Sequence, residues 1–251
     1  MLVREPQIAI FAARSREQFE LALRAHAASF APELARIAGE TNLATAVRTA
    51  LDRAEFYGFS NRGPTRLFLE LMLTFGSEFD TDPVLSWTRP WLDNRSTDQM
   101  VRAVNLHAAM QTYVVRVAGL DGSAALASLR RARSLRLEDF DAMGDVSNDD
   151  LLAMLRSTYP DRWELAGPAA LECVIGHASR LTQSVALPAA AGTALLTGVL
   201  FGFGHGAADD PLYPWIGQTL RSRQIVEPRA RLVRLHRKVN AYIDGVLAGA
   251  G

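Results

Sequence analysis

The stretch that decides the fold is Phe201–Trp215, which reads FGFGHGAADDPLYPW. A similar stretch, FGSEFDTDPVLSW, occupies Phe75–Trp87 much earlier in the chain. Both contain Phe-Gly, then Asp-Pro, then Trp, at the same spacing. Glycine is typical of the end of one helix, and aspartate followed by proline is typical of the start of the next. The pattern therefore predicts a corner between two helices that the chain builds twice.

The two corners align when the sequence is shifted by 128 positions. In each corner we expect the glycine to end a helix, the aspartate to cap the next, the proline to start it and the tryptophan to pack one turn later. These structural residues are Gly76, Asp82, Pro83, Trp87, Gly204, Asp210, Pro211 and Trp215. Twin catalytic acids at Asp82 and Asp210 are the alternative interpretation, which we do not favour because aspartate before proline at a helix start is usually a cap.

The correspondence continues on both sides of the corners. Upstream, Gly39 aligns with Gly167, and downstream, after one inserted residue, LHAAMQTYV (Leu106–Val114) lies over LHRKVNAYI (Leu235–Ile243). A nearly constant offset over about a hundred residues is typical of an internal duplication. Chance similarity between helical segments of biased composition is the alternative.

The repeat unit has helical periodicity, with apolar residues such as Leu43, Val47 and Leu51 four apart. We therefore predict an all-α fold of two tandem pseudo-symmetric helical repeats packed into one helical assembly. Residues 1–118 form the first repeat, 119–147 the connecting segment and 148–251 the second repeat. In the connecting segment we expect a solvated helix, a turn near Gly144 and an N-cap at Ser147 or Asn148.

Composition narrows the classes of partner. The 251 residues include 27 Lys and Arg and 27 Asp and Glu, so the formal net charge is zero and a nucleic-acid partner is not expected. Cys173 is the only cysteine, which excludes an internal disulfide, and its apolar surroundings predict a buried side chain. The opening MLVREPQIAIF does not resemble a secretory signal, so we expect a cytoplasmic protein.

One stretch has the length of a membrane span. Val185–Gly204 holds twenty residues without a charge. Its counterpart Tyr57–Gly76 carries Arg62, Arg66 and Glu70, which would be costly in lipid. The duplication therefore predicts a buried helix, and contact with a membrane is not expected.

Differences between the two copies suggest partner-binding surfaces. A charged stripe at Arg62, Arg66, Glu70 and Thr74 is replaced by the small residues Ala190, Ala194, Gly198 and Gly202. Small residues every fourth position let another backbone approach closely, so the stripe either packs on the chain's own helices or docks a partner helix. A second candidate surface is the basic outer face that we expect on the C-terminal helix, which includes Arg229, Arg231 and Arg234. Contact of this face with a membrane or an acidic partner is the alternative to a plain packed helix.

Motifs for catalysis and metal binding are absent from the sequence. The histidines form no His-Glu-x-x-His pattern, and no Ser elbow or phosphate-binding loop is present. His107 and His236 are equivalent in the two copies, and we expect both to be hydrogen-bonded core residues. We predict no catalytic, cofactor-binding or metal-binding residues and no cofactor.

Three segments carry a resemblance to a known group of proteins. Ala54–Trp87, Phe201–Ile216 and the opening MLVREPQIAIF resemble uncharacterised helical accessory proteins encoded beside bacterial type VI secretion and polymorphic-toxin genes. The resemblance implies a cytoplasmic, non-enzymatic adaptor or chaperone for a secreted toxin effector, with that effector or a secretion component as its protein partner. An immunity protein that neutralises the toxin is one alternative, and a helical enzyme or the toxin itself is another.

Overall fold

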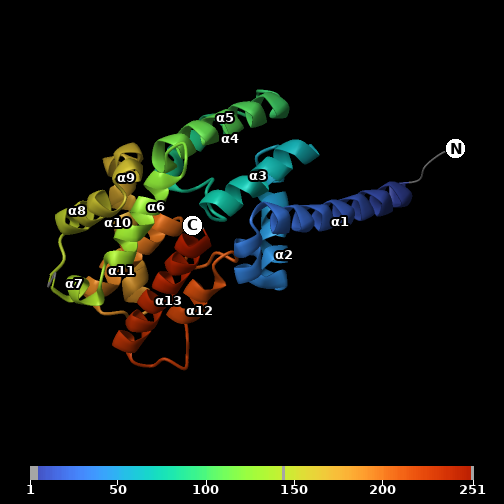
Figure 1. Ribbon diagram of the computed structural model, residues 1–251. Helices are drawn as coiled ribbons and strands as arrows, with labels where there is room; N and C mark the ends of the chain where they lie inside the picture. Colours follow the sequence, from blue (N-terminus) through green and yellow to red (C-terminus); the bar gives the residue numbers. More distant parts are fainter. Residues whose placement is uncertain (1–4, 143–144, 250–251) are drawn as a thin grey trace.

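The computed structural model describes residues 5–142 and 145–249, and its regular elements there are all helical (Figure 1). No strand occurs within those ranges, which confirms the predicted all-α class. Met1–Arg4 of the opening segment and Gly144 of the expected turn lie outside the described residues.

The helices follow one another with short connections. In chain order they are α1 (Glu5–Phe30), α2 (Pro32–Phe56), α3 (Arg62–Phe75), the 3₁₀ helix η1 (Pro83–Thr88), α4 (Arg89–Leu92), α5 (Gln99–Ala118), α6 (Ser123–Ser134), α7 (Leu137–Ala142), α8 (Asn148–Thr158), α9 (Pro160–Ala166), α10 (Pro168–Ser184), α11 (Ala189–Phe203), α12 (Pro214–Leu220) and α13 (Pro228–Gly249). In Figure 1, α1, α2 and α3 gather at one end of the molecule, and α6 to α11 gather at the other. The α5 helix runs along the top of the view from the second group to a place above α3. The N-terminal part of α1 projects away from the body.

Several helix boundaries recur at the offset read from the sequence. The α2 helix spans Pro32–Phe56 with a break at Gly39 (φ 75°, ψ 164°). The pair α9 and α10 spans Pro160–Ser184 with a break at Gly167 (φ 76°, ψ 157°). Positive φ at both breaks needs glycine, because a Cβ would be strained there.

The two corners lie back to back. Gly76 ends α3 with φ 100° and Gly204 ends α11 with φ 103°. A Cβ on Gly76 would lie 2.8 Å from the carbonyl oxygen of Phe203, and a Cβ on Gly204 would lie 2.7 Å from that of Phe75. The glycines therefore do more than end their helices, since they let the two backbones touch.

A set of three aromatic rings recurs in the two corners, and Tyr213 adds a fourth ring to the second corner. In the first, Trp87 stacks on Tyr113 with ring centroids 5.4 Å apart and planes at 28°. In the second, Trp215 stacks on Tyr242 at 6.0 Å and 29°. Both stacks are completed edge-on by the phenylalanine that ends the preceding helix, namely Phe75 and Phe203.

The second corner differs from the prediction in one respect. Pro83 starts the 3₁₀ helix η1, but Pro211 starts no helix, because Asp210–Tyr213 forms a turn and α12 begins at Pro214. The residue before a proline avoids the helical region, and Tyr213 accordingly has φ −123° and ψ 54°. The extra proline therefore delays the helix by one turn.

Two arginines donate hydrogen bonds to carbonyl groups at the C-terminal ends of helices, a role that was not predicted from the sequence. The guanidinium of buried Arg102 on α5 donates to the carbonyl of Tyr57 at 3.0 Å, and that of Arg231 on α13 donates to the carbonyl of Val185 at 2.6 Å. Tyr57 and Val185 are the C-terminal caps of α2 and α10, where orphan carbonyls attract cations. Arg231 therefore points inward, and its predicted place on the outer basic face is wrong.

The connecting segment packs against the body. The α6 helix contacts α5, α8 and α13, and Arg131 donates to the carbonyl of Thr158 at 3.0 Å, so α6 is not the solvated connector that we expected. Ser147, one of the two predicted N-caps, caps α8, and it also forms a capping box with Asp150. The apolar helix α11 is largely buried, and across the described ranges no helix combines the length and the apolar character needed to cross a bilayer.

We predict that Gly76→Ala and Gly204→Ala each lower the free energy of unfolding by about 2–4 kcal/mol, because both add backbone strain and a clash with the other corner. Gly245→Ala is the matched control, since Gly245 lies in α13 with no neighbour near its Cβ position. That change should stabilise by up to about 1 kcal/mol. Urea unfolding of the three variants measures the difference, and near-neutral corner variants would contradict the close approach.

Candidate functional site

The two predicted corner aspartates lie at the junction of the corners. The carboxylate of Asp210 accepts hydrogen bonds from the Ser77 N–H at 2.7 Å, the Ser77 hydroxyl at 2.6 Å and the Leu212 N–H at 2.8 Å. The carboxylate of Asp82 accepts from the Val84 N–H at 2.9 Å and the His205 N–H at 3.2 Å. Each aspartate thus binds its own turn and also the first amide after the glycine of the opposite corner.

The burial of both aspartates indicates that their role is structural. Asp82 is 3% exposed and Asp210 is 5% exposed, and each has several donors in place. Buried carboxylates are tolerated when their oxygens are hydrogen-bonded in this way. Asp82 caps η1, and Asp210 closes the turn that precedes α12, so the two carboxylates link the first corner to the second.

The surroundings shift the pKa values of the two aspartates in opposite directions. Burial acts to raise the pKa of Asp82, but hydrogen bonding to His205 and the positive charge of Arg162 outweigh burial and lower that pKa. Burial dominates at Asp210 and raises its pKa despite the hydrogen bonds from Ser77 and Leu212. The two aspartates therefore have similar hydrogen-bond partners, but their surroundings favour the ionised form of Asp82 and disfavour the ionised form of Asp210.

His205 adds a titratable group to this junction. Burial acts to lower the pKa of His205, and the nearby carboxylates of Asp82 and Glu78 more than offset burial, so the pKa is raised. Its Nε2 lies 3.3 Å from a carboxylate oxygen of Glu78, and its ring meets that of His177 with centroids 6.2 Å apart. Within the described part of the chain, no group of three or more His, Cys, Asp or Glu is placed to hold a metal ion.

A buried ion pair beside the junction was not predicted. Asp80 is fully buried and accepts from the Nε of Arg53 at 2.7 Å. The 128-residue offset puts Ala208 and Leu181 at these two positions in the second half. Only the first half carries this ion pair. The sequence predictions rested on residues that match between the two halves, so they did not include Asp80 or Arg53.

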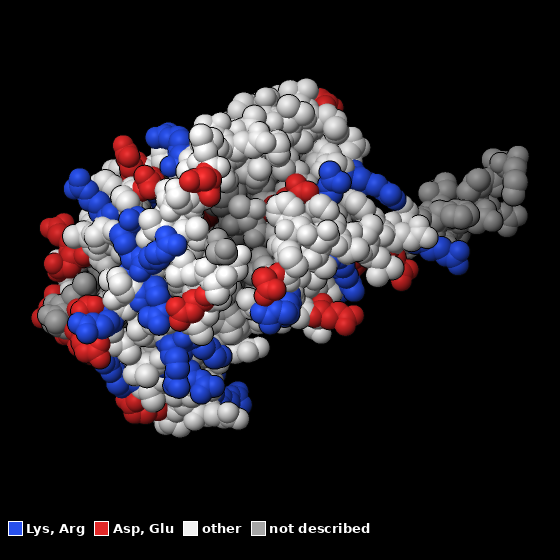
Figure 2. Space-filling model, in the orientation of Figure 1, with Lys and Arg blue, Asp and Glu red and all other residues white. Residues whose placement is uncertain are grey.

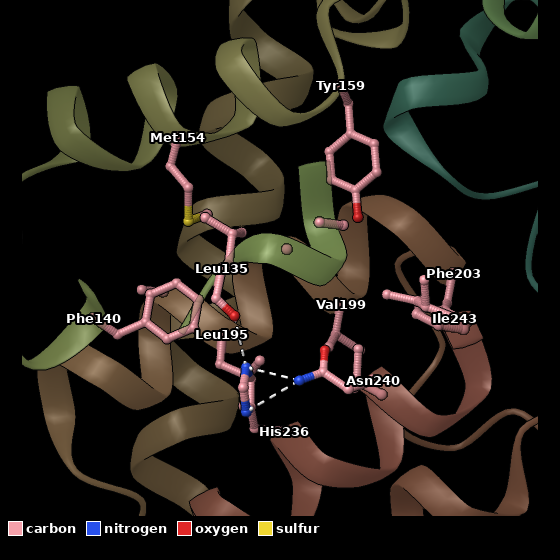
Figure 3. Close-up of a pocket in the computed structure, with 14 residues that line it drawn as sticks. Leu135, Phe140, Met154, Tyr159, Leu195, Val199, Phe203, His236, Asn240 and Ile243 are labelled. Carbon is pink, nitrogen blue, oxygen red and sulfur yellow. Dashed lines mark hydrogen bonds between the residues drawn. The ribbon is translucent and has the colours of Figure 1, made fainter. Parts of the chain in front are cut away.

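The predicted small-residue stripe of α11 lies against the chain's own residues. Ala194 is fully buried, and a Cβ on Gly202 would lie 2.9 Å from the hydroxyl of Tyr159, a side chain that is labelled in Figure 3. Ala190 and Gly198 are partly exposed. The short helix α7 covers this stripe, and its Phe140 is only 2% exposed.

Helix α7 is held in a groove between α11 and α13. The ring of Phe140 meets that of His236 edge-on with centroids 6.3 Å apart, and the Nε2 of His236 lies within hydrogen-bonding distance, 3.0 Å, of the carbonyl oxygen of Leu135. Arg229, a predicted partner-binding residue, forms an ion pair with Asp141 of α7. The fit leaves a cavity of about 30 Å³ in the groove. The other predicted basic residue of α13, Arg234, is exposed.

Two predictions about single residues are wrong. Cys173 is exposed, because the helical period of α10 buries Leu171, Val174 and Ile175 and turns position 173 to the solvent. His107 is exposed on α5, whereas its counterpart His236 is half-buried and hydrogen-bonded. The difference arises because α7 covers His236.

Comparison with known proteins gives no further guide to these features. No family model matches the chain, and no match is found among curated proteins or solved structures.

We predict that Asp82→Asn and Asp210→Asn each lower the free energy of unfolding by about 2–3 kcal/mol, because the amide cannot accept at both positions and buried donors lose their partner. Asp209→Asn is the matched control, since Asp209 is exposed and pairs with Arg221 at the surface. That variant should change stability by less than about 1 kcal/mol. Urea unfolding near neutral pH checks the ranking, and equal effects at Asp209 and Asp210 would refute it.

We also predict that the stability contributed by His205 declines with rising pH. Its folded-state pKa is raised, so protonation favours the folded state; that contribution is complete below the unfolded value of about 6.5 and disappears as pH passes the folded value. Unfolding of the parent protein and of His205→Gln should differ most near about pH 5.5 and least near about pH 8.5. A difference that grows with pH would contradict the assigned environment of His205. The pKa of His177 is lowered, first by burial and then by the charge of His205, so both proteins should also carry His177→Gln to remove its titration from the comparison.

Proposed function

We propose that this chain is a tandem duplication of one helical unit and that it acts as an adaptor or chaperone for a secreted toxin effector. The observation that carries the binding function is the groove between α11 and α13, which holds the short helix α7 with Phe140 buried. A scaffold that already binds a short helix from elsewhere in its own chain has the geometry for helix-in-groove recognition.

The duplication is supported by features that recur at one offset. They include the paired glycine breaks, the reciprocal contacts of the two corners, the two aromatic stacks and the two arginines that close α2 and α10. Each feature depends on a particular residue type at a particular place. Their joint recurrence is difficult to attribute to chance between unrelated helical segments.

The contacts of α7 indicate how such a protein would hold a helical segment of an effector. Small residues on α11 allow close approach of the bound helix, an aromatic anchor fills the groove, and Arg229 pairs with an acidic residue at the edge. Anchors of this kind supply most of the affinity in helix-in-groove complexes. The chain would thereby shield an apolar effector segment before secretion.

The connection to secretion comes from the sequence. Ala54–Trp87 and Phe201–Ile216 resemble accessory proteins encoded beside type VI secretion and polymorphic-toxin genes, and this resemblance favours a cytoplasmic protein with an effector or secretion component as its partner. The balanced charge agrees with a protein partner rather than a nucleic acid.

The proposal is tested by producing the tagged chain together with the products of the adjacent genes. We expect a defined one-to-one complex with the adjacent effector, and loss of effector secretion when the gene is deleted, without loss of protection from the toxin. Protection lost on deletion would instead identify an immunity protein, and growth arrest on production of the chain alone would identify a toxin or enzyme. Either result would overturn the adaptor function.

A further inference from the structure

A second groove lies open in the first half of the chain, between α3 and α5. It has a volume of about 280 Å³, and two apolar side chains on its α5 wall are well exposed, Met100 at 47% and Val104 at 65%. Figure 2 shows that the surface over α5 is almost free of charged side chains. Exposed apolar residues that cluster along a groove indicate a binding surface more often than isolated ones do.

This groove corresponds in position to the one that α7 fills. Among the residues that line the two grooves, the offset of the duplication pairs four positions: Arg66 with Ala194, Leu67 with Leu195, Glu70 with Gly198, and His107 with His236. The second-half groove retains about 30 Å³ with α7 in place, whereas the first-half groove has about 280 Å³. The same arrangement of helices is therefore present once filled and once open.

Among the residues that the structure describes, the first half has no separate short helix equivalent to α7, which explains why one groove is filled and the other is open. A shift of 128 places α7 over residues 9–14, which belong to the continuous helix α1 (Glu5–Phe30). In Figure 1 this part of α1 leads away from the body instead of folding back toward α3 and α5. Within the described ranges, no segment of the first half lies in the groove as α7 does in the second.

We propose that the open groove between α3 and α5 binds a short amphipathic helix of the effector that resembles α7. The inference rests on the proposed adaptor function. Helix α7 reads LEDFDA, with Leu137 and Phe140 on one face and Glu138, Asp139 and Asp141 as acidic neighbours. The expected ligand therefore carries a leucine and a phenylalanine three residues apart with acidic residues around them.

The open groove offers a partner for each part of such a helix. Met100, Val104 and Leu67 provide an apolar surface for the leucine and phenylalanine. Exposed His107 occupies the place where His236 meets the ring of Phe140.

The charges of the groove also suit an acidic helix. The side chain of Arg66 is 59% exposed at the groove edge. The carboxylate of Glu70 lies 2.7 Å from His26 and 3.5 Å from Arg66, so basic groups surround the negative charge in the groove. Arg66 can therefore attract acidic side chains of the bound helix in the way that Arg229 attracts Asp141.

The test uses the full chain and a blocked peptide of residues 134–142, SLRLEDFDA, as the probe. The peptide is titrated to millimolar concentration against the ¹⁵N-labelled protein, and amide shifts locate the binding site. We expect saturable shifts along α3 and α5. Val104→Asp should weaken binding at least tenfold because it places a charge in the apolar wall.

Val233→Asp is the matched control, because Val233 is the exposed counterpart of Val104 beside the filled groove, and it should leave binding unchanged. A peptide with alanine in place of Leu137 and Phe140 should not bind. Met100→Lys provides a second groove variant should Val104→Asp change the urea midpoint.

Three results would overturn the inference. The first is the absence of saturable amide shifts, and the second is a set of shifts confined to α11 and α13. The third is a dimer of the chain, seen by sedimentation, that Val104→Asp dissociates. Such a dimer would make a second copy of the chain the occupant of the groove. If the effector still co-purifies with Val104→Asp and Met100→Lys at unchanged affinity, the groove assignment fails while the adaptor function stands. If no effector complex forms with the parent protein, the proposed function fails by itself.

Discussion

The contact between the two corners is the interaction on which the rest of the structure depends. Gly76 and Gly204 let the ends of α3 and α11 touch, and Asp82 and Asp210 each accept a backbone hydrogen bond from the opposite corner. A larger residue at either glycine would separate the backbones, and loss of either carboxylate would leave buried donors without a partner. The corner contact therefore joins the two groups of helices.

The grooves follow from how helices pack around these corners. In each half, the helix that ends at the corner glycine forms one wall, α3 or α11, and the last long helix of that half forms the other, α5 or α13. The aromatic stacks of Trp87 on Tyr113 and Trp215 on Tyr242 hold the last helix against the corner. The connecting segment places α7 against α11 and α13, whereas the cavity between α3 and α5 is lined by residues of those two helices alone.

Local signals in the sequence predicted local structure well. Helical periodicity predicted the all-α class, and the positive φ of Gly76 and the cap at Ser147 followed from known helix-end chemistry. The sequence could not predict that the corners touch each other, because capping signals describe one chain segment and not its distant neighbour. Single-copy features were missed for a related reason: the ion pair of Asp80 and the covering of His236 by α7 have no counterpart to compare.

The most direct test of the corner contact is a double-mutant cycle between Ser77 and Asp210, which lie 133 residues apart in sequence and share a hydrogen bond of 2.6 Å. Unfolding free energies of Ser77→Ala, Asp210→Asn and the double variant give the coupling between the two side chains. Interlocked corners predict a coupling of about 1–3 kcal/mol. Effects of the two substitutions that add within about 0.5 kcal/mol would show that the side chains do not interact, and would contradict the joining of the two halves at this contact.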